Sequence, residues 1–291
     1  MPPGTVARQH AGPAVAMVVG AIVAVQCGAA LAVKLFDRVG PEGAVFLRTA
    51  FAAAVLLALT RPGLRLVRQA GYREVFLFGL TFLGMNTCFY AALDRIPLGA
   101  AVTLEFVGPL GVAILGSRRR ADLLWAFLAA AGIVLLSDGL GPDGLLNLGA
   151  VLALLAGLSW GAYILQSARV GAAAPGHGAL AVAIAISAVL IAPLGIAEGG
   201  SELLAPAVLA VGLAVGVLSS VIPYSLEIEA LRRLPSGVFG VMMSLEPAVA
   251  ALVGFVALSQ DLGTTEIVAI ALVVCASAGA LRTASPPPRD S

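Results

Sequence analysis

The chain has 291 residues, of which 60% are hydrophobic and only 11% are charged. A soluble globular domain has roughly 45–50% apolar and about 25% charged residues. One core cannot hide this apolar excess, so lipid must be the solvent for much of the surface. The net charge of +1 gives no general attraction to nucleic acid, and no nucleic-acid partner is expected.

A helix that crosses a membrane needs about 20 mostly apolar residues. Ten windows come near this requirement, namely 14–36, 42–60, 73–93, 98–116, 121–137, 146–167, 178–197, 206–229, 236–258 and 265–281. The alternation of a transmembrane β-strand is absent. The sequence therefore predicts an all-α integral membrane protein with ten transmembrane helices. The first apolar run is too long for a cleaved signal peptide, so we expect a retained helix.

Basic residues are distributed unevenly between the two sides of these windows. With the N-terminus in the cytoplasm, thirteen arginines fall on the inner side, whereas only Lys34, Arg38 and Arg95 fall at or near the outer side. Cytoplasmic loops of membrane proteins carry an excess of Lys and Arg. This bias predicts a multi-pass membrane protein with both termini in the cytoplasm and lipid around it.

One segment occurs twice, 138 positions apart: residues 92–116 and 230–254 are identical at eight of twenty-five positions. Each half of the chain holds five windows, an odd number, so the second half must be upside down relative to the first. We predict two inverted five-helix repeats, at 14–137 and 146–282, followed by a cytoplasmic tail at 283–291. Inverted repeats of this kind support alternating access in transporters.

The chemistry of the repeat lies in two buried acids and two prolines. Glu105 and Glu246 fall near the middle of the fourth and ninth windows, where an ionisable group costs about 2.5–3.5 kcal/mol on insertion scales. Pro109 and Pro247 lack an N–H, so each leaves the carbonyl four residues earlier without its helical partner. A free carbonyl beside a carboxylate offers only acceptors, which suits a proton or an ammonium group.

Other polar groups fall at similar depth. Arg48 lies about two turns inside the second window, Glu227 near the inner end of the eighth, and Pro223, with Ser219 four residues earlier, makes a third helix break. Further polar and aromatic residues at this depth are Gln26, Asn86, Tyr90, Ser159, Trp160, Tyr163, Tyr224 and Ser244. Simpler roles compete: a proline can be only a kink, Glu229 can pair with Arg233, and Lys34 can reach outward to the interface.

Enzymatic and metal chemistry find little support. The two histidines, His10 and His177, lie outside the windows, no aspartate lies at mid-membrane, and the three cysteines do not have metal-binding spacing. We therefore expect neither an enzyme nor a metal or cofactor site. A structural or signalling partner protein would leave the two buried acids unexplained. A homodimer is left open by the sequence.

Two long strings, GMNTCFYAALDRIPLGAAVTLEFVGPL at 84–110 and IPYSLEIEALRRLPSGVFGVMMSLEPAVAAL at 222–252, resemble the EamA group of the drug/metabolite transporter superfamily. Within that group the chain is most similar to inner-membrane threonine/homoserine exporters. The resemblance implies a ten-helix inverted-repeat exporter driven by the proton gradient. It singles out Asn86, Glu105, Pro109, Tyr224, Glu227, Glu246 and Pro247. Two positions depart from the pattern: Lys34 is shifted by one residue, and Ser259-Gln260-Asp261 replaces a usual Gly-Glu.

We therefore predict a secondary exporter of small amino acids, threonine and homoserine first. A zwitterion needs an anion for its ammonium, which Glu105 or Glu246 would supply, and a donor for its carboxylate, from Arg48, Asn86 or a broken-helix N-terminus. Tyr90, Tyr163 or Ser244 would form a hydrogen bond with the side-chain hydroxyl of the substrate. The alternative is efflux of another amino acid, a purine or an amphipathic drug, against which the aromatic content of 6% argues mildly.

Overall fold

The computed structural model describes residues 11–115, 121–137, 144–174, 176–234 and 236–283, and this part of the chain contains helices and no strand. In chain order the elements are α2 (Ala11–Val33), α3 (Phe36–Thr60), α4 (Leu64–Ala70), α5 (Tyr72–Leu93), α6 (Leu98–Glu105), α7 (Val107–Leu115), α8 (Ala121–Ser137), η2 (Gly144–Leu146), α9 (Leu148–Ala173), α10 (Gly178–Gly199), η3 (Gly200–Leu204), α11 (Pro206–Gly216), η4 (Val217–Val221), α12 (Ile222–Leu231), α13 (Ser236–Met243), α14 (Glu246–Leu258) and α15 (Thr264–Thr283).

In the described residues, each of the ten apolar windows is largely helical. Within the described residues, seven helical segments are long and apolar enough to cross a membrane, and three shorter apolar helices cover 98–112, 124–136 and 264–279. Large apolar side chains such as Leu59, Leu115 and Phe127 are exposed on the outside of the bundle, where a soluble protein would place polar groups. The prediction of an all-α membrane protein is confirmed.

The fourth and ninth windows are each interrupted. Phe106 separates α6 from α7. Ser244 and Leu245 separate α13 from α14, so the second break begins 138 positions after the first. Pro109 and Pro247 follow the two breaks closely, and each removes an N–H that a continuous helix would need. In the eighth window a π-helical turn, η4, lies directly before Pro223. These three prolines lie at or just after irregular turns, and α3 has a further kink at Gly40, directly before Pro41.

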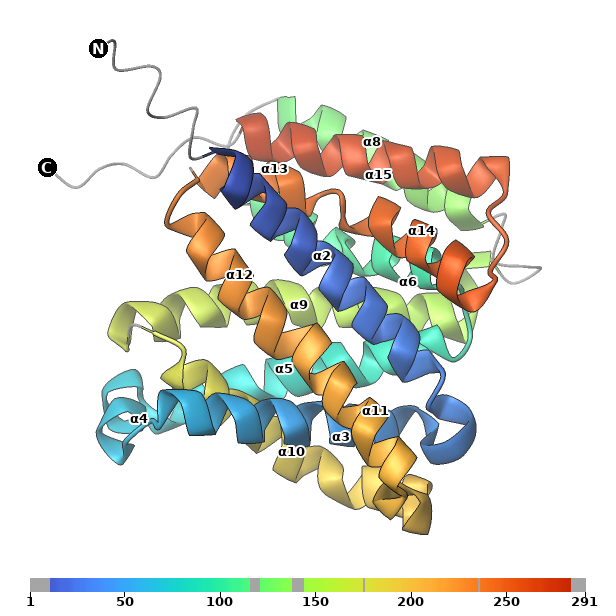
Figure 1. Ribbon diagram of the computed structural model, residues 1–291. Helices are drawn as coiled ribbons and strands as arrows, with labels where there is room; N and C mark the ends of the chain where they lie inside the picture. The colour runs from blue at the N-terminus through green and yellow to red at the C-terminus, as the bar shows by residue number, and fades with distance from the viewer. Residues whose placement is uncertain (1–10, 116–120, 138–143, 175, 235, 284–291) are drawn as a thin grey trace, which may run out of the picture.

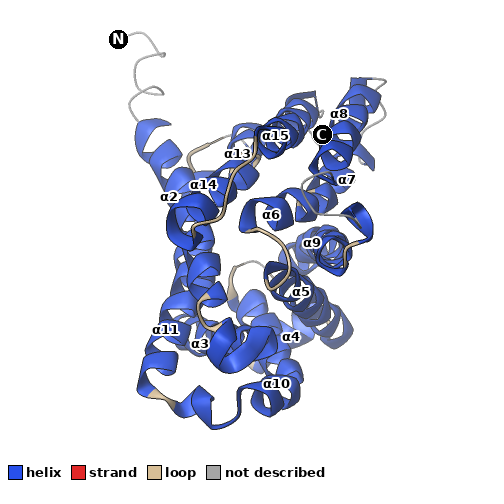
Figure 2. Ribbon diagram, turned by 90° about the vertical axis from the view of Figure 1, so that its right-hand side faces the viewer, coloured by secondary structure: helices blue, strands red, loops and turns tan. Residues whose placement is uncertain are grey.

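Long-range packing joins the two halves along their whole length. α3 packs along α10, α8 along α15, and α6 against α14. α5 lies against α9 and α10, while α2 packs against η4, α12 and α14. Figure 1 shows α8 and α15 together at one edge of the bundle and α3 with α10 at the opposite edge. Figure 2, turned by 90°, shows α2 and α11 on one side and α5 and α9 on the other.

Small residues let these helices approach closely. A Cβ added to Gly99 of α6 would lie 2.8 Å from the Cα of Ala251 in α14, and one added to Gly132 of α8 would lie 2.8 Å from the carbonyl oxygen of Ala269 in α15. Close backbone approach at Gly and Ala is typical of membrane helix interfaces, where lipid supplies no hydrophobic driving force.

Candidate transport site

A cavity of about 1130 Å³ lies between the two sides of the bundle, and residues of α2, α3, α5, α9 and α12 contribute to its wall. The wall also includes both broken helices, through Glu105 and Phe106 beside the first break and Met243 and Glu246 beside the second. A cavity at the meeting point of discontinuous helices is where transporters of inverted-repeat architecture bind their substrates.

Three carboxylates and one guanidinium meet in the deep part of this cavity. Glu105, Glu227, Glu246 and Arg48 all line it, although they come from four different helices. Glu246 interacts electrostatically with Glu227 and Glu105, whereas Glu105 interacts with Arg48. Fully ionised, this group would carry an excess of two negative charges. Protons or a substrate cation are the partners that would balance it.

Among the described residues, Arg48 is held by a backbone carbonyl and a tyrosine rather than by a carboxylate at hydrogen-bond distance. Its Nη2 donates to the carbonyl oxygen of Ser219 at 3.2 Å and its Nη1 to the hydroxyl of Tyr90 at 3.4 Å. The guanidinium also lies over the Tyr90 ring, 5.5 Å from its centroid. The side chain is only 7% exposed.

The other predicted residues divide into two groups. Asn86, Tyr163, Tyr224, Pro109 and Pro223 line the cavity with the charged residues; the amide nitrogen of Asn86 donates to the carbonyl of Phe82 at 2.7 Å. Tyr90, Ser244 and Pro247 are not among the described residues of the cavity wall. Tyr90 lies behind Arg48, and the hydroxyl of Ser244 donates to the carbonyl of Val241 at 2.6 Å.

Aromatic side chains are concentrated here although they are scarce in the whole chain. Seven line the cavity among the described residues: Phe78, Phe89, Phe106, Trp160, Tyr163, Tyr224 and Phe239. The ring of Phe106, the residue that separates α6 from α7, meets Trp160 edge-to-face at 5.3 Å. The wall therefore offers apolar surface as well as charge.

The backbone at the first helix break packs closely against the backbone of α9. A Cβ added to Gly157 would lie 2.5 Å from the carbonyl oxygen of Glu105, and one added to Gly108 would lie 1.8 Å from the carbonyl oxygen of Gly157. Pro109 provides no N–H for that Glu105 carbonyl. Two glycines thus bring the broken helix directly against the backbone of α9, which fixes the depth of Glu105.

The cavity reaches one end of the bundle, the end that carries α4 in Figure 1. Its lining residues there include Ala174, His177 and Arg232. Burial and, to a lesser extent, the charge of Arg232 lower the pKa of His177. His177 is therefore neutral at physiological pH, and Arg232 supplies the positive charge at this mouth.

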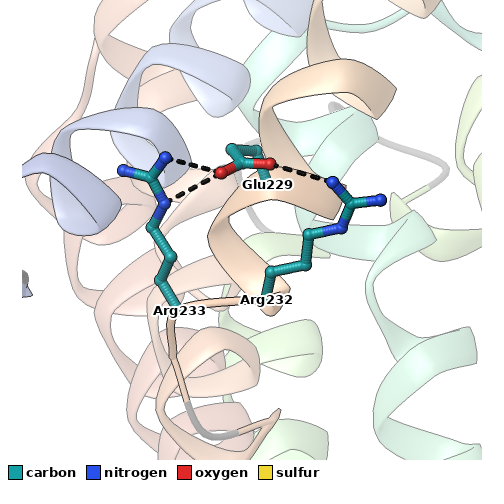
Figure 3. A network of polar contacts seen from close by, with 3 residues as sticks. All are labelled: Glu229, Arg232 and Arg233. Atoms are coloured by element: carbon teal, nitrogen blue, oxygen red, sulfur yellow. Dashed lines mark hydrogen bonds and ion pairs between the residues drawn. The ribbon is translucent and has the colours of Figure 1, made fainter.

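A polar network beside the mouth ties down the end of α12 (Figure 3). Glu229 accepts from Arg233 Nε at 2.9 Å and Nη2 at 2.5 Å, and from Arg232 Nη1 at 3.3 Å. The predicted pairing of Glu229 with Arg233 is confirmed. Lys34, at the other end of the bundle, is exposed, as expected for a residue that reaches outward.

The opposite end of the bundle is closed by contacts between distant segments. The side-chain oxygen of Gln260 accepts from the backbone N–H of Leu98 at 3.0 Å, which joins the α14–α15 connection to the start of α6. Arg38 forms an ion pair with Glu202. Glu198 accepts from the N–H groups of Glu42 at 2.8 Å and Gly43 at 3.2 Å. Gln260, at a position where the sequence departs from the expected pattern, is thus part of this closure.

Comparison with known proteins identifies the family of the chain. Residues 147–282 match the EamA-like transporter family. The chain is 42% identical to the threonine/homoserine exporter RhtA of Salmonella typhimurium (strain SL1344), over 90% of this chain and 89% of that protein. It is 39% identical to RhtA of Escherichia coli (strain K12), over 97% of this chain and 95% of that protein.

The chain belongs to the EamA-like transporter family. The sequence-based assignment to this family is therefore confirmed, and the relatives are transporters rather than enzymes. A more distant relative, the uncharacterized transporter YwfM of Bacillus subtilis (strain 168), is 27% identical over 76% of the chain and 77% of its own length. A crystal structure with 23% identity has a TM-score of 0.64 and covers 93% of this chain and 98% of that one, so the fold is shared.

Three residues of the cavity wall were not predicted as site residues. Gln26, Ser219 and Ser277 line the cavity, and each has a buried side-chain oxygen without a hydrogen-bond partner among the described residues. Depth in the windows pointed to Gln26, and the spacing to Pro223 pointed to Ser219. The sequence held no signal that their side-chain oxygens would remain unpaired.

Proposed function

We propose that this protein exports threonine and homoserine across the bacterial inner membrane and that inward proton movement drives the export. The observation that carries the proposal is the charged cavity, with Glu105, Glu227 and Glu246 facing Arg48. The chain that builds it is 39–42% identical over most of its length to threonine/homoserine exporters. A small zwitterion needs both signs of charge in one place, and this cavity has them.

Proton coupling follows from the charge imbalance of the site. A zwitterion adds no net charge, so substrate binding alone leaves the excess of acids in place. A proton on one carboxylate removes part of the excess negative charge. The ammonium group of the substrate can replace that proton. Competition between the two cations for one carboxylate is a simple way to couple their opposite movements.

We further propose that the ten apolar helices form two inverted five-helix repeats. In support, three of the long-range pairs join corresponding windows of the two halves: α3 with α10, α8 with α15, and α6 of the fourth window with α14 of the ninth. The paired helix breaks, 138 positions apart, have the same relation. Because the cavity reaches the arginine-rich end, the positive-inside rule makes this the cytoplasmically open, substrate-loading state.

Orientation can be tested with single cysteines in a background lacking Cys27, Cys88 and Cys275. Ser201 and Gln69 are exposed at opposite ends of the bundle. We expect an impermeant maleimide to label Ser201→Cys in intact cells, and Gln69→Cys only after permeabilisation. They are preferable to Gly200 and Gly71, whose φ values of +51° and +87° disfavour a side chain. Equal labelling of both variants in intact cells would overturn the proposed topology.

The substrate is tested by counterflow in liposomes. Vesicles that contain the purified protein and unlabelled threonine or homoserine should accumulate the same amino acid in radiolabelled form, and an imposed pH gradient should increase the transport. Cells that overproduce the protein should tolerate excess threonine and hold a lower internal pool. An unchanged pool, with the protein present in the membrane, would remove this substrate assignment.

The aromatic lining favours one alternative, efflux of a larger or amphipathic solute. The seven aromatic rings around the cavity give apolar surface that a threonine side chain does not use. The same liposomes should therefore be assayed with radiolabelled leucine and with tetraphenylphosphonium. Transport of either one without threonine transport would replace the proposed substrate while leaving the transport function intact.

A further inference from the structure

Three residues of the cavity wall each have a buried polar atom that is unpaired. The Nε of Arg48, the hydroxyl of Ser219 and the side-chain oxygen of Gln26 have no hydrogen-bond partner among the described residues. The three side chains are 7%, 4% and 2% exposed, and all of them line the cavity. A buried polar group without a partner costs about 1–3 kcal/mol, so unpaired atoms on residues that line one cavity indicate a polar ligand.

The geometry points to a subsite for the substrate carboxylate, and we propose that Arg48 and Ser219 bind this group, with Gln26 beside them. An Nε–H and a hydroxyl are both donors, and the guanidinium carries the charge that a carboxylate needs. The unpaired oxygen of Gln26 is an acceptor, so the two unpaired donors are those of Arg48 and Ser219, and Gln26 would contact the carboxylate only through its amide nitrogen. This inference rests on the proposed function, because it takes an amino acid as the substrate.

The π-helical turn and Pro223 position this subsite. Pro223 has no N–H to offer the carbonyl of Ser219, four residues earlier, and Arg48 Nη2 donates to that oxygen instead. The N–H of Ile222 reaches back five residues to Val217, which widens the turn around Ser219. Gly28 of α2 permits the close contact, since a Cβ there would lie 2.2 Å from the Ser219 hydroxyl. Pro223 is therefore a positioning residue for Arg48.

The proposed subsite and the acidic residues bind opposite ends of the substrate. The ammonium group would lie against Glu105, Glu227 or Glu246, and the carboxylate against Arg48. A ligand that lacks its carboxylate loses the second set of contacts only. The subsite therefore predicts a preference for an amino acid over its own amide, separate from any effect of the carboxylates of the protein.

The experiment measures this preference by titrating the purified protein with threonine, homoserine and leucine, each beside its amide, and following the melting temperature. Binding to the folded state raises that temperature. We expect the wild type to prefer the acid by roughly tenfold or more, the value of a charge-assisted hydrogen bond. Arg48→Gln should reduce the ratio to within about threefold of one, and Ser219→Ala should reduce it partly.

Matched controls separate a subsite from a general structural effect. Ser220 is also buried with an unpaired hydroxyl but is not in the described cavity wall, so Ser220→Ala should keep the wild-type ratio. Pro223→Ala restores an N–H that competes for the Ser219 carbonyl and should lower the ratio. Pro193→Ala, at an exposed proline inside α10, should not.

The outcomes distinguish this inference from the proposed function. Threonine counterflow with an acid-to-amide ratio unchanged in Arg48→Gln and Ser219→Ala would overturn the subsite and leave the exporter. A ratio that falls in those variants for leucine, without threonine counterflow, would support the subsite and remove the threonine assignment. Equal affinity of the wild type for acid and amide in every pair, or binding of neither member, would overturn the subsite.

Discussion

Glu246→Gln is expected to abolish export driven by a pH gradient while leaving threonine counterflow measurable. Glu246 interacts electrostatically with two other acids, Glu227 and Glu105, and its side chain is only 6% exposed. We propose that this carboxylate takes up and releases the coupling proton. Gln keeps the shape and an acceptor but cannot carry that proton, and it is cheaper to bury than Glu.

Glu105→Gln is expected to behave differently, because Glu105 shares its surroundings with Arg48. It should weaken substrate binding and exchange together, by roughly 10–100-fold, as expected for the loss of a hydrogen bond between charged groups. Both variants are compared in liposomes with and without a pH gradient. Glu229→Gln is the matched control, since this acid belongs to the surface network of α12 and is not in the described cavity wall. Wild-type export in Glu105→Gln and Glu246→Gln would mean that both carboxylates are structural.

The sequence predicted the helices and their breaks because both depend on local chemistry. An apolar run of about twenty residues has one stable form in lipid, a helix that satisfies its own backbone. A proline removes one N–H at a known place, so Pro109, Pro223 and Pro247 each indicated a nearby irregular turn without any knowledge of tertiary contacts. Pro193 shows the limit of this rule, because it lies inside α10 without a break. The paired breaks were visible for the same reason, since the repeat preserves both prolines.

The pairing of side chains across the cavity could not be predicted in this way. The bond between Arg48 and the Ser219 carbonyl joins residues 171 positions apart, and the contact of Gln260 with Leu98 joins residues 162 positions apart. Depth alone grouped Tyr90 with the cavity residues, whereas it lies behind Arg48. Composition alone counted few aromatics, whereas helix packing gathers seven of them around one cavity.

Gly108→Ala is expected to destabilise the protein by at least about 1–3 kcal/mol, the usual cost of forcing an extra methyl group into a packed interior. The added Cβ would lie 1.8 Å from the carbonyl oxygen of Gly157 and 2.5 Å from its carbonyl carbon. Both atoms belong to the backbone of α9, which cannot rotate away as a side chain can. α7 must therefore move off α9, and Glu105 at the adjoining helix break must move with it.

Gly111→Ala provides the control within the same helix. A Cβ at Gly111 meets no atom within 4 Å, so this variant should gain the helix propensity of alanine, about 1 kcal/mol, without a clash. The melting temperature of the purified protein and threonine counterflow are measured for both variants. We expect Gly108→Ala to lower both the melting temperature and threonine counterflow. Gly111→Ala should lower neither. Equal behaviour of the two variants would show that contact between α7 and α9 does not hold Glu105 at its depth, and the rigid helix break would lose its role in the site.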